Sequence, residues 1–176
     1  MGRKRRASRI SQKVYCFIVE GYTEENYIRL LKLLYRKSGD PKNCKGGNAK
    51  GVLKKAKKLI QQHGDDYSGY IVWFDGDKFS SGDVALRDEL ASRKDIETQI
   101  YINEPCVENW LLAHFQTILS HSASSEMCEK TLRQHIPHYK KNDNVLLKRY
   151  INKTHVVTAI VNYPEIGEIP KEYFIE

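Results

Sequence analysis

The stretch Tyr70-Ile71-Val72-Trp73-Phe74-Asp75-Gly76-Asp77 decides the fold. Its apolar part is short, continuous and rich in β-branched and aromatic residues, which is typical of a strand buried on both faces of a parallel sheet. Open α/β sheets bind ligands just past the carboxyl ends of such strands, where Asp75 and Asp77 follow. Two carboxylates at alternate positions can converge on a hard cation such as Mg²⁺, and Gly76 allows a tight turn between them. A polar turn that merely closes a strand accounts for the segment equally well.

A second run of the same kind lies near the N-terminus, at residues 14–19, and is followed directly by Glu20. An amphipathic helical pattern begins a few residues later. Thr23 is expected to cap this helix, and Glu24 and Glu25 are expected to complement its dipole. Glu20 is therefore the functional candidate of this segment, because it lies at the tip of the strand.

Strand and helix patterns alternate as far as residue 115. Helices are predicted at 52–62, 84–93 and 107–115, with a strand at 96–102 and a brief strand within 38–51. This alternation predicts an α/β protein, with a mainly parallel sheet of right-handed crossovers flanked by helices. Beyond it, short helices are predicted at 126–136 and 145–151, 156–161 fits helix or strand, and 163–176 stays unassigned.

The chain therefore divides into three predicted parts: a basic arm at 1–13, an α/β core at 14–119, and a small, mostly helical C-terminal extension at 120–176 packed on that core. The formal net charge of the 176 residues is +7, and the arm holds six basic residues and no acid. These six are Arg3, Lys4, Arg5, Arg6, Arg9 and Lys13. Such an arm favours a polyanion partner bound through phosphates, with a solvated tail as the alternative.

Composition excludes several classes of protein. No apolar run approaches the ~20 residues that span a bilayer, and no secretory h-region is present, so a cytoplasmic protein without membrane contact is expected. The four cysteines lack Cys-x-x-Cys spacing and are expected to be reduced thiols, with Cys16 and Cys106 buried. The six histidines lack the pairing of a zinc site.

The helix predicted at 52–62 carries a lysine-rich outer face that includes Lys54. Such a face is usually solvated surface, but beside a phosphate-handling crevice it could guide a nucleic-acid strand. The preceding loop is rich in Gly, Asn and Lys but lacks the residue order of a P-loop.

Acids at two strand tips suggest one chemistry. Neighbouring strands lie only ~5 Å apart, so Glu20, Asp75 and Asp77 could share a metal ion. Aspartates that hold Mg²⁺, with a nearby Glu as ligand or acid/base, are suited to phosphoryl transfer.

These residues also carry a family resemblance. Glu20-Gly21 and Asp75-Gly76-Asp77 resemble the Toprim domain, a Rossmann-like fold found in primases, topoisomerases and nucleases. Three further segments resemble the RloB family, a Toprim-like group associated with bacterial defence. They are EGYTEENY at 20–27, NEPCVENWLLAHF at 103–115, and Tyr139-Lys140-Lys141.

The resemblance implies a metal-dependent endonuclease that cleaves DNA or RNA, tRNA included, in defence against phage. It implies Glu20 as acid/base, Asp75 and Asp77 as ligands of Mg²⁺ or Mn²⁺, and Glu20 as a further ligand. Glu108 carries over as a fourth catalytic acid. The resemblance also implies a partner or activator protein.

Alternatives remain for the outer residues. Glu108 could satisfy backbone N–H groups at its helix start. Lys141, and Lys140 beside it, are either phosphate contacts or surface charges. His114 is expected to be a core histidine. For the whole protein, the alternative is a Toprim scaffold that binds nucleic acid or a partner protein without catalysis.

Overall fold

A four-stranded parallel sheet organises the molecule in a computed structural model that describes residues 14–176. The strand order is β2-β1-β3-β4. The strands are β1 (Tyr15–Val19), β2 (Asp40–Asn43), β3 (Gly69–Asp75) and β4 (Thr98–Asn103). All three strand pairings are parallel, so the predicted α/β, Rossmann-like fold is confirmed, including the brief second strand.

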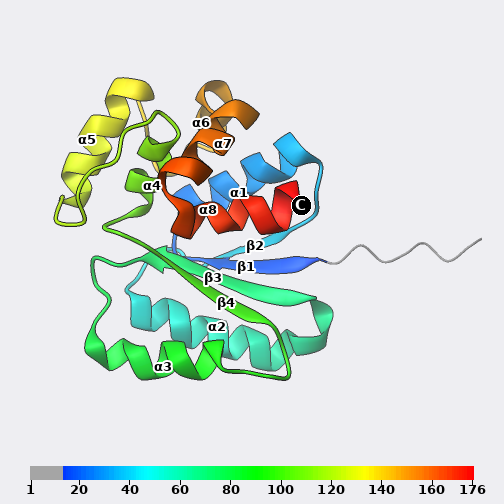
Figure 1. Ribbon diagram of the computed structural model, residues 1–176. Helices are drawn as coiled ribbons and strands as arrows, with labels where there is room; N and C mark the ends of the chain where they lie inside the picture. The colour runs from blue at the N-terminus through cyan, green and yellow to red at the C-terminus, as the bar shows by residue number, and fades with distance from the viewer. Residues whose placement is uncertain (1–13) are drawn as a thin grey trace, which may run out of the picture.

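Helices cover both faces of this sheet (Figure 1). α2 and α3 lie on one face, and α1 lies on the other with the C-terminal helices. The helices of the first part of the chain are α1 (Tyr22–Tyr35), α2 (Ala49–His63), η1 (Gly64–Asp66), α3 (Ser81–Ala91) and α4 (Val107–Ala113). Their bounds lie within a few residues of those predicted.

The strand β3 alternates its side chains between two cores. Ile71 and Trp73 belong to the core on the α1 side, and Tyr70, Val72 and Phe74 belong to the core on the α2 side. None of the five is more than 1% exposed, so the predicted burial on both faces is confirmed. Burial of this kind explains why the strand reads as a continuous apolar run.

The C-terminal extension is helical, as predicted. It consists of α5 (Ser125–His135), α6 (Leu146–Tyr150), α7 (Lys153–Asn162), α8 (Pro164–Pro170) and η2 (Lys171–Ile175). The ambiguous segment at 156–161 is therefore helical, and the unassigned end is helical too. In η2, Tyr173 and Phe174 pack against Phe17 of β1, so the extension shares the core of the sheet. A domain boundary after residue 119 stays a prediction.

Two local predictions have clear outcomes. The expectation that Thr23 caps α1 is wrong, because the helix already begins at Tyr22 with Gly21 as its N-cap. The four cysteines all lie in the described range and are free, with Cys16 and Cys106 buried as expected. Within residues 14–176, no helix is long and apolar enough to cross a membrane.

Candidate active site

Glu20 and Asp75 lie at the tips of two neighbouring strands. Glu20 directly follows β1, Asp75 ends β3, and the two strands pair with Val19 opposite Trp73. The backbone N–H of Asp75 donates a hydrogen bond of 3.0 Å to Oε2 of Glu20. The expectation that the strand order brings these two acids together is therefore met.

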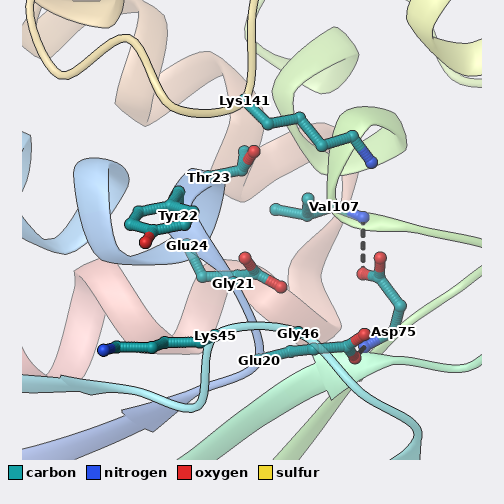
Figure 2. Close-up of a pocket in the computed structure, with 10 residues that line it drawn as sticks. All are labelled: Glu20, Gly21, Tyr22, Thr23, Glu24, Lys45, Gly46, Asp75, Val107 and Lys141. Carbon is teal, nitrogen blue, oxygen red and sulfur yellow. Dashed lines mark hydrogen bonds between the residues drawn. The ribbon is translucent and has the colours of Figure 1, made fainter.

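Both carboxylates line a pocket of about 250 Å³ at this edge of the sheet (Figure 2). Glu24, from the first turn of α1, points into the same pocket and is only 3% exposed. The other lining residues are Gly21, Tyr22, Thr23, Lys45, Gly46, Val107 and Lys141.

Asp75 is held in place through its Oδ1 atom. This oxygen accepts hydrogen bonds from the backbone N–H of Val107, at 2.8 Å, and from Nδ2 of Asn103, at 3.1 Å. The Asn103 amide is oriented in turn by Trp73, whose Nε1 donates to Asn103 Oδ1 at 2.9 Å. The Asp75 side chain is therefore fixed by two strands and by the start of α4.

The pocket carboxylates are costly to ionise. Burial, followed by the charges of Glu108 and Glu20, raises the pKa of Asp75 to about 7. Burial, followed by the charge of Asp75, raises the pKa of Glu24 well above its usual value, and burial also raises the pKa of Glu20. Among residues 14–176, no basic group forms an ion pair with any of these three acids. A bound cation would therefore relieve unfavourable interactions that the protein leaves in place.

Asp77 lies differently from the other predicted ligands. It is exposed in the turn after β3 and does not line the pocket, although its charge adds to the effect of burial on the pKa of Glu20. Gly76 between the acids does not use a left-handed backbone conformation. Its hydrogen atoms face β4, where a Cβ would lie 3.0 Å from the Asn103 carbonyl oxygen. In the described part of the chain, no three His, Cys, Asp or Glu side chains are grouped so as to hold a metal ion.

Glu108 is completely buried next to the pocket. Its Oε1 accepts a hydrogen bond of 3.0 Å from the Tyr139 hydroxyl and pairs with Lys141 Nζ at 3.2 Å. Its Oε2 is buried without a hydrogen-bond partner. Lys141 also pairs with Glu129 at 3.3 Å. Both side-chain partners of Glu108, Tyr139 and Lys141, therefore belong to the C-terminal extension.

The predicted nucleic-acid contacts are dispersed. Lys141 lines the pocket, and its role as a phosphate contact stays a prediction. Lys140 and Lys54 are exposed, on the loop after α5 and on α2, and neither lines the pocket. Arg3, Lys4, Arg5 and Arg6 lie outside the described residues.

Sequence patterns alone do not predict two of the pocket residues, Glu24 and Lys45. The pattern around Glu24 predicts only a residue that complements the helix dipole, and the loop that contains Lys45 lacks the residue order of a P-loop. The signal for Glu24 is its place in the EGYTE string, in the first turn of the helix that begins directly after Glu20-Gly21. Lys45 precedes Gly46 and Gly47, both at positive φ, in a loop whose Gly46 N–H donates to the Glu20 carbonyl at 2.8 Å.

A four-stranded parallel sheet flanked by helices, with acids at adjacent strand tips, defines this protein as an α/β protein of Rossmann-like fold. The family model described as RloB-like protein matches residues 15–170, and the chain belongs to this family. Comparison with curated proteins and with solved structures gave no match.

Proposed function

We propose that this RloB-like protein is a Mg²⁺-dependent endonuclease that hydrolyses phosphodiester bonds in DNA or RNA. The observation that carries the proposal is a group of three carboxylates, the buried Glu24 and the half-buried Glu20 and Asp75, that line one pocket without an ion-pair partner in the described chain. Because burying such charges is costly, their retention supports a role toward a cation and a phosphate.

The donor set suits magnesium. Mg²⁺ prefers oxygen ligands, keeps several waters and usually binds proteins through one or two carboxylates. Glu20 and Asp75 would supply these carboxylates, and the exposed Asp77 lies two residues from Asp75 as a further donor. Mn²⁺ has the same preference for oxygen and could replace Mg²⁺. The bound ion would neutralise charge on the attacked phosphate.

The remaining residues have roles of their own. Glu24, which lines the same pocket as Glu20 and Asp75, would serve as the acid or base for the attacking water. Asn103 and the Val107 N–H keep Asp75 in position. Lys141, held at the pocket edge by Glu108 and Glu129, would contact a phosphate with its remaining donor.

The cellular role that we propose is defence against phage, with a partner or activator protein that controls the nuclease. Membership in the RloB-like family supports this role through the defence association that the sequence resemblance implied.

Cleavage assays test the proposal directly. The full-length protein is incubated with plasmid DNA, single-stranded DNA, total RNA and tRNA in Mg²⁺, in Mn²⁺ and in EDTA. Wild-type protein should cleave at least one substrate only with the metal. Asp75→Asn should abolish this cleavage, whereas Asp88→Asn, on the exposed surface of α3, should leave it unchanged.

Two outcomes would contradict the proposal. Cleavage that is equal in wild type and Asp75→Asn would arise from a contaminant. Metal-independent binding with no cleavage of any substrate would instead favour a non-catalytic scaffold, an alternative that the lack of a preassembled three-donor group in the described residues supports.

A further inference from the structure

A second cavity, of about 360 Å³, adjoins the acid pocket. Tyr22 and Lys45 line both cavities and so form the boundary between them. The other lining residues of the second cavity are Glu25, Pro41, Lys42, Asn43, Lys55 and Leu59. The acid pocket therefore continues into a groove that runs past α1 and over the end of β2.

The groove carries an excess of positive charge. Its one acid, Glu25, is already paired with Arg29 at 2.7 Å and accepts a hydrogen bond from Asn43 at 2.7 Å. Lys45 has no ion pair in the described chain, and Lys55 Nζ donates only to the Asn43 carbonyl oxygen at 3.2 Å. The acid pocket attracts cations, whereas the adjoining groove attracts anions.

The backbone of Lys45 is anchored at the boundary. Its backbone N–H donates to Asn43 Oδ1 at 2.5 Å, and the neighbouring Cys44 N–H donates to the Val19 carbonyl at 2.8 Å. The loop is thus anchored to the tip of β1, beside Glu20. Figure 2 shows the Lys45 side chain extending along the pocket rim, away from Asp75.

Tyr22 supplies an aromatic ring at the same boundary. Its side chain is 49% exposed, although large apolar surfaces are usually covered, and no aromatic partner of its ring is found within residues 14–176. Figure 2 shows its ring on the same side of the pocket as the Lys45 amino group. An exposed ring beside free cations is the combination that binds single-stranded nucleic acid, because the ring stacks on a base while the cations contact phosphates.

We propose that this groove, with Tyr22 and Lys45 at its entrance, holds a single-stranded stretch of nucleic acid next to the phosphate that enters the acid pocket. Tyr22 stacks on an unpaired base, Lys45 contacts the phosphate beside it, and Lys55 contacts the strand farther along. The inference rests on the proposed function for its substrate class. A duplex keeps its bases stacked on one another, so it offers Tyr22 no free base.

Binding without cleavage tests this inference. The anisotropy of fluorescein-labelled 12-nucleotide single-stranded DNA, single-stranded RNA and the matching duplex is measured with full-length Asp75→Asn protein in Mg²⁺. Into this background we introduce Tyr22→Ala, Tyr22→Phe, Lys45→Met and Lys94→Met. Lys94 is an exposed lysine ahead of β4, at the opposite edge of the sheet, and serves as the matched charge control.

Tyr22→Ala should weaken binding of the single strand about tenfold or more, and Tyr22→Phe should keep it within about twofold. The affinity falls with salt, so the slope of log affinity against log salt concentration is negative. Lys45→Met should make this slope less steep by about 0.7, and Lys94→Met should leave it unchanged. The ratio of DNA to RNA affinity then identifies the preferred strand.

Unchanged single-strand affinity in Tyr22→Ala, or tighter binding of the duplex, would overturn the inference. Its failure differs from that of the proposed function. Metal-dependent cleavage by wild type, combined with unchanged binding by Tyr22→Ala, would contradict only the inference that the groove binds a single strand. Binding that depends on Tyr22, without any cleavage by wild type, would contradict only the proposed nuclease activity.

Discussion

The acid pocket and the cluster beside it both contain wholly or partly buried titratable side chains, but these side chains are satisfied in different ways. We define this α4 cluster as Glu108, Tyr139, Lys141, Tyr27 and His114. In the α4 cluster, Glu108 has a basic partner in Lys141 and a hydroxyl donor in Tyr139. In the acid pocket, Asp75 and Glu20 accept only uncharged N–H donors within the described chain.

The difference separates a structural use of buried charge from a functional one. A buried charge is tolerated when it is paired, and breaking such a pair is strongly destabilising. The α4 cluster follows this rule. It joins Glu108 of α4 to Tyr139 and Lys141 in the C-terminal extension. The pocket leaves the cost unrelieved at the sheet edge where α/β proteins bind ligands. We therefore infer that the pocket is kept for a ligand and the α4 cluster for stability.

The sharpest test of the comparison is to remove one carboxylate charge from each region. Asp75→Asn should lower the rate of metal-dependent cleavage about 100-fold or more, because a charged ligand of the metal ion that neutralises the reacting phosphate is lost. Glu108→Gln should change the rate less than about tenfold, measured at a temperature where circular dichroism shows both variants folded. An equal loss in folded Glu108→Gln would place Glu108 in the catalytic machinery, as the family resemblance implied.

The second largest effect should come from breaking the pair in the α4 cluster. Lys141→Met leaves the Glu108 carboxylate buried with Tyr139 as its remaining partner. We expect the free energy of unfolding in urea to fall by about 2 kcal/mol, less than for a fully buried pair because half of the Lys141 side chain is exposed.

A double-mutant cycle separates pairing from other losses. Glu108→Gln combined with Lys141→Met should lose less stability than the sum of the two single changes, because the double variant has no Glu108 charge left without its partner. Additive losses would show that Lys141 does not stabilise Glu108. The α4 cluster would then resemble the acid pocket.

A pH dependence of stability should come from His114. This residue is 1% exposed, its Nδ1 lies 3.1 Å from the Trp110 carbonyl oxygen, and its Nε2 lies 3.0 Å from the Tyr27 hydroxyl. Because a carbonyl oxygen can only accept, Nδ1 carries the proton and Nε2 accepts from Tyr27. Burial of the ring lowers the pKa of His114 to about 3.

The sign follows from proton binding. Below pH 6.5 the unfolded chain protonates this histidine and the folded protein does not, so stability is present above pH 6.5 and is lost as pH falls toward 3. Between pH 7.5 and 5.5 wild type should lose on the order of 1 kcal/mol relative to His114→Gln. His138→Asn, at an exposed residue with a φ of 62°, is the control and should follow wild type. Parallel curves for wild type and His114→Gln would mean that the imidazole is charged in the folded state.

The sheet and the acids at its strand tips could be predicted from the sequence, because both depend on local patterns. Apolar runs predicted the strands, and a parallel sheet places the ends of adjacent strands together, so Glu20 and Asp75 could be paired in advance. The start of α1 was harder to predict, because the observed N-cap, Gly21, lies two residues before the predicted cap, Thr23. With Gly21 rather than Thr23 as the cap, Thr23 and Glu24 enter the first helical turn, and both are buried. Thr23 then contacts Tyr139, 116 residues away, which no local pattern could indicate.

That contact gives the smallest expected effect. The Tyr139 hydroxyl donates a hydrogen bond to Glu108. The Thr23 hydroxyl, 2.9 Å from the Tyr139 oxygen, must therefore donate its own hydrogen bond to Tyr139. Thr23→Val keeps the side-chain shape but removes this donor, and should lower the free energy of unfolding by about 1 kcal/mol. Thr23→Ser, which keeps the hydroxyl, should recover most of the loss that arises from the hydrogen bond.

The comparison also fixes what Thr23→Val should leave alone. Thr23 lines the acid pocket through its side chain but bonds to the α4 cluster, so a structural role predicts a cleavage rate within about twofold of wild type at a temperature where both are folded. A much larger fall in rate, with stability unchanged, would mean that the chain from Thr23 through Tyr139 to Glu108 positions the pocket acids. The two regions would then act as one site, and the unpaired Oε2 of Glu108 would belong to it.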